Sequence, residues 1–292
     1  MAEQNATNLR QANTKVKVQG KLSEKVLEKK VVDGVNAIIG HLTLKTSDTN
    51  FVRFDINVKE KTKEGKDNSI YAGMKTIMEE YQSIADAGEE GADVVAVTNG
   101  NLNPYTGRDG VDRVGYKSNF FNRVNNPDDF NPHAEFEAEI FIQSIVPEIA
   151  DEEETGRIIV NGWVPTYSGI EPIKLVADDA TGAAVESMFL PNQTAEFYGE
   201  ILNEKVVKVI EKPVVIGKPR KEIKTTYKNT LLITGVSPAY EEDSVVKPYD
   251  PEVIRAAIQE RKNRMEERKN QSQSQTQNKQ KPSGASRGRA LF

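Results

Sequence analysis

Two stretches of the chain show the same order of predicted elements. From Lys15 to Val124 the sequence predicts three strands, a helix and two further strands, and from Phe136 to Ser237 a similar order recurs. The clearest strand covers residues 51–59, where apolar and polar side chains alternate with the period of two expected when one face is buried. Such a repeat predicts two small β domains of one design.

The position of the helix among the strands of each stretch indicates the fold of the domain. In the first stretch, apolar side chains recur at helical spacing, at Ile70, Met74, Ile77, Met78, Tyr81 and Ile84. In the second, residues 180–190 predict a shorter helix. Three strands, a helix and two strands are typical of the OB-fold, a Greek-key barrel whose second and third strands and loops hold oligonucleotides or oligosaccharides. We therefore predict a mainly β protein with two tandem OB-fold-like five-stranded barrels, each with an inserted helix.

The remaining segments complete the predicted domain organisation. Prolines and polar residues from Pro127 to Pro132 indicate a boundary between the barrels. Asp250 and Pro251 suit a helix start, and the Gln/Ser-rich end has too little apolar content to fold. The predicted parts are a disordered N-terminus (1–14), barrel domains at 15–130 and 131–240, a C-terminal helix (250–269) and a disordered tail (270–292).

Charge is separated along the chain, whose formal net charge is -5. Residues 252–292 carry ten Lys/Arg against four Asp/Glu, whereas the first 251 residues carry 29 against 40. An anionic ligand of the folded part must therefore meet a local basic stripe, because the field in a groove depends on nearby charges. The absence of Cys, of a secretory signal and of an apolar run of about 20 residues leads us to expect a cytoplasmic protein without membrane spans.

In the first domain, the outward face of strands two and three carries one aromatic side chain together with Lys and Arg. Candidate DNA-binding residues there are Lys45, Phe51, Arg53 and Lys59. Bases stack on aromatic faces while Lys and Arg follow the phosphates. The alternative is an ordinary solvated strand, which shows the same alternation of polar and core residues, and the pattern alone does not separate the two.

Further candidates surround the loop predicted at residues 99–110, since such loops close over ligand in OB-folds. Tyr105 and Arg108 offer a ring and a cation within the loop, and the segment after it interleaves rings and cations, with Tyr116, Lys117 and Arg123 as candidates. Some of these rings belong to the core, and the sequence does not say which.

In the second domain, residues 157–167 and 170–176 predict a hairpin with Trp163 and Tyr167 on its outward face. The alternative for Trp163, the only tryptophan, is a place in the core. The loop at residues 216–224 carries four cations against one Glu, and Arg220 and Lys221 are candidates for phosphate contacts. A solvated hairpin tip is the alternative for this loop.

No motif for catalysis or for a cofactor is present. The two histidines are far apart in the sequence and Cys is absent, so no zinc site is predicted, and no phosphate-binding glycine motif or hydrolase motif occurs. The tail ends on Leu291 and Phe292, which suit a short handle for partner proteins, with an inert solubilising tail as the alternative. We expect no metal, no cofactor and no enzymatic activity.

The element order, the aromatic and basic strand faces and a tail ending in Phe292 together resemble single-stranded DNA-binding proteins, especially the divergent kind encoded by bacteriophages. The resemblance implies sequence-independent coating of single-stranded DNA during DNA replication or recombination, and recruitment of other replication or recombination proteins through the tail. The tail departs from the bacterial pattern, because it is basic and closes on Arg-Ala-Leu-Phe rather than on an acidic Asp-Pro-Phe end. The competing hypothesis is a phage structural or adaptor protein whose barrels make protein contacts through an acidic surface.

Overall fold

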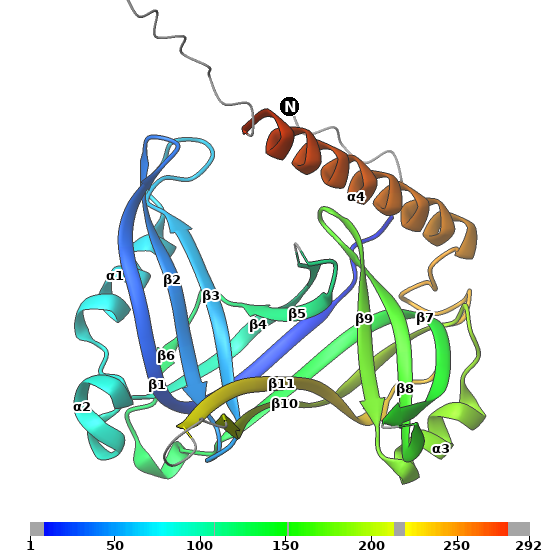
Figure 1. Cartoon of the computed structure of the whole chain (residues 1–292), viewed down its shortest axis with the longest axis horizontal. Helices are drawn as coiled ribbons and strands as arrows, with labels where there is room; N and C mark the ends of the chain where they lie inside the picture. The colour runs from blue at the N-terminus through cyan, green and yellow to red at the C-terminus, as the bar shows by residue number, and fades with distance from the viewer. Residues whose placement is uncertain (1–8, 108, 151, 213–219, 280–292) are drawn as a thin grey trace, which may run out of the picture.

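The computed structural model describes residues 9–107, 109–150, 152–212 and 220–279, and the side chains of all of these except residues 150, 205–212, 220–227 and 271–279 (Figure 1). Mainly β structure dominates the chain, as the sequence predicts. Two barrels lie side by side, with the first in blue to cyan and the second largely in green in Figure 1.

The first barrel closes in the strand order of an OB-fold. Strands pair in the order β1-β2-β3-β5-β4, and β4 returns to β1. The pair β3–β5 is parallel, through Phe54 and Tyr116, and the other pairs are antiparallel. Two helices are inserted between β3 and β4. The elements are β1 (Thr14–Val32), β2 (Val35–Lys45), β3 (Phe51–Lys59), α1 (Ser69–Glu80), α2 (Ile84–Gly91), β4 (Val94–Thr106), β5 (Asp112–Lys117) and a short strand, β6 (Asn122–Arg123), on β4.

The second barrel repeats this order with β7-β8-β9-β11-β10 and a closing pair between β10 and β7. Its parallel pair joins β9 to β11 at Val176 and Leu232, so both barrels have the same topology. A 3-10 turn precedes it and a long helix follows. The elements are η1 (Pro127–Asp129), β7 (His133–Ala150), β8 (Glu153–Thr166), β9 (Gly169–Ala177), α3 (Asp179–Met188), β10 (Thr194–Lys212), β11 (Arg220–Val236) and α4 (Pro251–Lys279).

A strand pair joins the two barrels into one 11-stranded sheet. The start of β1, Thr14 to Gln19, runs antiparallel to the start of β7, from Ala138 back to His133. The buried apolar side chains also form one cluster, which includes Phe54 of the first barrel and Phe136 and Phe197 of the second. Backbone hydrogen bonds and apolar packing therefore both fix the barrels relative to each other.

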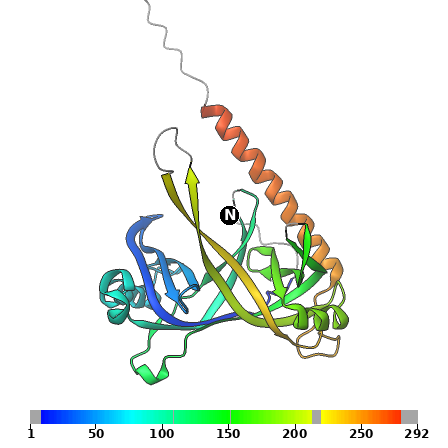
Figure 2. The same cartoon turned by 60° about the horizontal axis from the view of Figure 1, so that its bottom comes forward.

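The hairpin of β10 and β11 is a second connection between the barrels, and its far part extends away from them in Figure 2. Asn50, in the turn before β3, donates from Nδ2 to the carbonyl of Ile201 (2.9 Å) and accepts at Oδ1 from the backbone N–H of Asn203 (2.7 Å). In return, Asn203 donates from its amide to the carbonyl of Phe51 (2.5 Å). The β10–β11 hairpin of the second barrel is thus anchored at the start of β3 in the first barrel.

Where the sequence predicts one helix over residues 70–84, the structure has two. Tyr81 takes an extended backbone after α1, and its buried hydroxyl donates to the carbonyl of Phe121 (3.1 Å). Ser83 then starts α2 through a capping box with Asp86. The apolar stripe of α1 and Tyr81 packs on the core, whereas α2 has no buried residue and Ile84 is only partly buried.

The loop predicted at residues 99–110 is shorter than expected, because β4 continues to Thr106. Gly100 lets β4 pass close to β1, since a Cβ at this position would lie 3.1 Å from Val16 Cβ. A glycine that suggests a turn in the sequence therefore serves a close strand crossing.

Both ends of the described chain differ from expectation. Arg10, placed in the disordered N-terminus by the sequence, forms an ion pair with the buried carboxylate of Glu139, and Ala12 donates its N–H to the carbonyl of Pro165 (2.9 Å). The helix that begins at Pro251 continues past Lys269 to Lys279 and lies across the top of the second barrel in Figure 1. No helix in the described part is long and apolar enough to cross a membrane.

Candidate nucleic-acid interface

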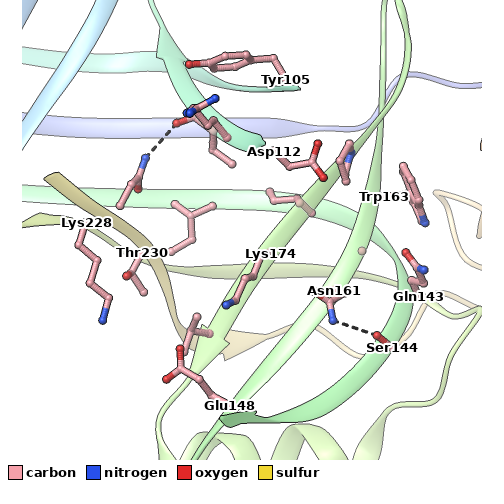
Figure 3. A pocket seen from close by; sticks show the side chains of 18 residues that line it. Tyr105, Asp112, Gln143, Ser144, Glu148, Asn161, Trp163, Lys174, Lys228 and Thr230 are labelled. Carbon is pink, nitrogen blue, oxygen red and sulfur yellow. Dashed lines mark hydrogen bonds between the residues drawn. The ribbon is translucent and has the colours of Figure 1, made fainter. Parts of the chain in front are cut away.

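A groove with a volume of about 770 Å³ lies between the two barrels (Figure 3). The first barrel contributes the β4–β5 hairpin, and the second contributes β7, β8, β9 and β11. The second and third strands of barrel two, β8 and β9, therefore form part of its wall, which is the face that holds ligand in OB-folds.

Two aromatic rings from different barrels face this groove. Along β8, Val160 and Val164 point to the core, so the alternating Asn161 and Trp163 point outward into the groove. Trp163 is half-buried and packs against the core with part of its ring. Tyr105 of β4 is 41% exposed and belongs to the same lining. Each ring thus keeps surface for a ligand while its backbone is held in a sheet.

Two lysines supply positive charge to the groove. Lys174 lies on the outward face of β9 between the core residues Ile173 and Leu175, and Lys228 lies on β11. Both are exposed, and within the described part of the chain neither has a carboxylate in ion-pair contact. Their charge is therefore available to an anionic ligand.

The other charged residues of the groove are already paired. Arg113 donates to Asp109 (Nη1 to Oδ1, 2.8 Å), and this bond lowers the pKa of the Asp109 carboxyl well below its usual range. Glu148 is near Arg157, with Oε2 3.6 Å from Nε, and Asp112 is near Arg261, with Oδ1 3.6 Å from Nη2. Among the described residues, the net unpaired charge of the groove side chains is thus positive.

Polar side chains complete the lining. Asn161 donates from Nδ2 to the hydroxyl of Ser144 (3.1 Å), and Gln143 sits at a β-bulge of β7, where the register with β8 shifts between Ile142 and Ser144. A bulge adds one residue on one strand and redirects its side chain. Amide and hydroxyl groups beside a ring give hydrogen-bonding partners to the edges of a stacked base.

Asn229 of β11 connects the groove to the first barrel. Its Oδ1 accepts from the hydroxyl of Tyr116 (2.8 Å), and its Nδ2 donates to the carbonyl of Val114 (3.0 Å). The groove walls are therefore held together by hydrogen bonds as well as by the sheet.

Tyr116, predicted to stack on DNA, is a core residue. It is 3% exposed, its ring lies 6.1 Å from that of Phe54, and burial raises the pKa of its hydroxyl. The alternation along β5 places Tyr116 inward and Lys117 outward, so the stacking prediction for Tyr116 is wrong while Lys117 is exposed as predicted.

The cations predicted on strands two and three of the first barrel point outward, but each has an acidic partner. Lys45 Nζ lies 3.0 Å from Asp48, which raises the pKa of the lysine, and 3.3 Å from Glu89. Arg53 pairs with Asp55 (3.1 Å). Lys59 pairs with Asp33 (2.8 Å) and lowers the pKa of that carboxyl.

Three further predicted residues lie apart from the groove lining. Phe51 begins β3 and is partly exposed. Arg123 on β6 is held by Asp93 (2.9 Å) and lies over the ring of Tyr81, 4.4 Å from its centroid. Tyr167 is 87% exposed at the tip of the β8–β9 hairpin. The structure thus brings together Tyr105 and Trp163 of the predicted set.

Several predicted residues are outside the described part of the chain. They are Arg108, Leu291 and Phe292, together with the side chains of Arg220 and Lys221, whose backbone belongs to β11.

The groove lysines were missed by sequence reasoning, although a signal for one of them exists. Lys174 alternates with Ile173 and Leu175, which marks it as outward on the predicted third strand. Lys228 has no such local signal, because whether it lines the groove depends on how β11 packs against the first barrel. Within the described residues, no three His, Asp or Glu side chains form a group that could hold a metal ion.

The fold and the groove together define a class of protein. It has two tandem OB-fold-like barrels, and the groove between them is lined by two aromatic rings and two lysines. The model of one protein family, YorF, matches residues 13–271. The chain therefore belongs to the YorF family. No curated protein sequence matches it.

Two solved structures from Thermus aquaticus are similar in outline. The wild-type single-stranded DNA binding protein has a TM-score of 0.47 at 8% identity, covering 81% of this chain and 98% of that chain. A deletion mutant of that protein gives 0.48 at 9% identity, covering 81% and 99%. A similarity of this size does not indicate a shared ligand.

Proposed function

We propose that this protein binds single-stranded DNA without catalysis and without sequence preference, and that the strand lies in the groove between the barrels. The observation that carries the proposal is the pairing of two outward rings, Tyr105 and Trp163, with two lysines that have no acidic partner in the described chain, Lys174 and Lys228. Rings that stack on bases and cations that neutralise phosphates are the two elements of single-strand recognition.

A single strand fits this groove better than a duplex does. Stacking on a protein ring needs a base whose face is open, and the bases of a duplex are stacked on each other. The lining mixes rings with amides and hydroxyls that accept or donate to any base edge. We therefore expect binding to homopolymers of different bases with affinities of the same order.

Titration with labelled oligo-dT tests the proposal, and the protein has its own reporter. Trp163 is the only tryptophan and lines the groove, so its fluorescence should be quenched when a base stacks on it. We expect micromolar or tighter binding at low salt and weaker binding as salt rises, because each neutralised phosphate releases counterions. Absence of micromolar binding at low salt would contradict the proposal.

Competition sharpens the ligand class. Unlabelled duplex DNA of the same length should compete poorly with oligo-dT, and oligo-dA should compete well. Oligo-U tests DNA against RNA, since the 2′-hydroxyl is the group that distinguishes them. Stronger competition by duplex than by single strands would overturn the assignment to single strands.

The cellular role that we propose is coating of single strands in phage DNA replication or recombination, on the basis of the resemblance to divergent phage-encoded single-stranded DNA-binding proteins. Recruitment of partner proteins through Leu291 and Phe292 is part of this proposal. Removing residues 270–292 should leave oligo-dT affinity within a few-fold and abolish capture of replication or recombination proteins. Unchanged capture would contradict the recruitment role.

One observation favours the alternative of an adaptor protein. A second hollow, of about 360 Å³, lies on the outer face of β7 and β10 and is lined by Glu135, Glu137, Glu196 and Glu200 with the exposed Tyr198. Glu137 pairs with Lys17 (2.8 Å), and the other three carboxylates repel phosphates and suit a basic protein surface. Recovery of a protein partner that is lost in Glu196→Lys, together with no oligonucleotide binding, would favour the adaptor function.

A further inference from the structure

Helix α4 places one arginine where both barrels and the groove meet. Arg261 is 8% exposed, although most of the residues that follow it on the helix, up to residue 270, are exposed. The preceding turns hold the helix in place, because Ile254 and Ala257 are buried on the same face. One turn further, Arg264 donates to the carbonyl of Ser168 at the β8–β9 hairpin tip (2.6 Å).

The guanidinium of Arg261 contacts residues of both barrels. On the second barrel, its Nε and Nη2 both lie 3.0 Å from Oε2 of Glu171 on β9. On the first barrel, Nη2 donates to the hydroxyl of Thr106 and lies 3.6 Å from Oδ1 of Asp112, at the two sides of the β4–β5 hairpin. A planar group with five donors in a rigid fork suits such a junction.

The same guanidinium lies over the groove tryptophan. Its central carbon is 5.8 Å from the centroid of the Trp163 ring, within the range of a cation–π contact. The hairpin that Arg261 holds on the first barrel also carries Tyr105. One side chain therefore touches one of the groove rings and anchors the strand pair that presents the other.

Arg261 also changes the charge at this end of the groove. Asp112 lines the groove, and Glu171 is adjacent to Pro172, another lining residue. Without a cation between them, the two carboxylates would repel each other and any phosphate that approached. Since the arginine is almost fully buried, it neutralises them without itself facing the ligand.

We infer that Arg261 is the positioning residue of the groove: it sets the place of the Trp163 ring and of the β4–β5 hairpin before nucleic acid binds. The effect on affinity rests on the proposed function, whereas the effect on Trp163 in the free protein does not. The two can therefore be measured separately.

The test compares Arg261→Gln with a matched control, Arg255→Gln, on the full chain. Arg255 is on the same helix, is 65% exposed and pairs with Glu252 of that helix. In the free protein, Arg261→Gln should shift the Trp163 emission to the red and increase its quenching by acrylamide. Arg255→Gln should match the wild type in both.

Oligonucleotide binding gives the second readout. Arg261→Gln should weaken oligo-dT binding about tenfold, equivalent to about 1.4 kcal/mol, with an unchanged dependence on salt because the arginine contacts no phosphate. A reduced salt dependence would show a phosphate contact and overturn the positioning role. Tighter oligo-dT binding by Arg261→Gln would also overturn the positioning role. It would indicate that the Arg261 contacts of α4 keep DNA out of the groove.

Two milder variants keep the test decisive if Arg261→Gln does not fold. Glu171→Gln and Asp112→Asn each remove the negative charge of one partner, and we expect a larger red shift in the first, since its contact is the closer. Unchanged emission in both would overturn the inference. If the wild type binds no oligonucleotide, the proposed function fails, and the emission data still decide the role of Arg261.

Discussion

The two barrels share one topology but differ in how the charges on the outward faces of their second and third strands are paired. On β2 and β3 of the first barrel, Lys45, Arg53 and Lys59 each lie within 3.1 Å of a carboxylate. On the corresponding strand of the second barrel, Lys174 has no such partner in the described chain. The comparison teaches that the same OB-like topology can carry paired charges on one barrel and an unpaired lysine on the other, so the topology alone does not specify a binding face.

The barrels also differ in the hairpin that ends each of them. The β4–β5 hairpin of the first barrel is compact, whereas the β10–β11 hairpin of the second is long and packs on the first through Asn203 and Asn229. The second barrel thus provides most of the groove wall. The first barrel provides the Tyr105 ring and the β4–β5 hairpin that closes the groove.

The largest expected difference between the barrels concerns stacking. Trp163→Ala should weaken oligo-dT binding by about 1–3 kcal/mol, or about five- to 150-fold, while Phe51→Ala should change it little. Fluorescence anisotropy of a labelled oligonucleotide measures both variants, and Trp163→Phe controls for packing. An equal loss in Phe51→Ala would place the strand on both barrels.

The connection between the barrels is expected to contribute to stability. Asn229→Ala leaves the buried Tyr116 hydroxyl without its acceptor, which should cost about 1–3 kcal/mol of unfolding free energy. Urea denaturation measures this, with the exposed Asn57→Ala as the control. Because the lost bond joins two barrels, a transition split into two steps in Asn229→Ala would show that they unfold separately.

The charge comparison predicts a smaller effect. Lys174→Gln and Lys228→Gln should each lower the slope of log affinity against log salt by about 0.7, the value for one phosphate contact on a single strand. Arg53→Gln and Lys59→Gln should leave the slope unchanged, because both cations already face carboxylates. Equal slopes for all four variants would remove the distinction between the faces.

The smallest effect concerns the helix caps and pH. In the folded protein, Ser83 lowers the pKa of Asp86 at α2, and the backbone N–H of Thr181 lowers that of Asp178 at α3. Both carboxylates therefore stabilise the fold above their unfolded pKa of about 4, and this stabilisation is lost as pH falls through the lower folded values.

Removing the Ser83 cap measures what the cap of α2, in the first barrel, contributes to stability. Ser83→Ala should cost about 0.5–1 kcal/mol near neutral pH and should flatten the fall in stability on acidification. Urea midpoints across acidic pH, compared with Asp178→Asn, measure each cap. A Ser83→Ala protein with the same acid dependence as the wild type would contradict the assigned pKa shift.

The sequence predicts the barrels well because their strands depend on local alternation, as along β3 and β8. The same alternation predicts that Trp163 lies on an outward strand face, whereas Tyr105, which the sequence places in a loop, lies on β4. It does not predict that Lys59 is neutralised by Asp33, because that pair forms only when β3 comes beside the turn after β1. Nor does it place Lys228, since the groove exists only where two barrels meet.

The pairing of β1 with β7 has a consequence for how the chain is made. A ribosome completes the first barrel at Arg123, and the edge of β1 from Thr14 to Gln19 then stays open until His133–Ala138 has been synthesised. An open edge accepts any matching strand, including β7 of a neighbouring nascent copy. The seam that joins the two barrels in the finished protein is therefore the edge that needs protection while the chain is being made.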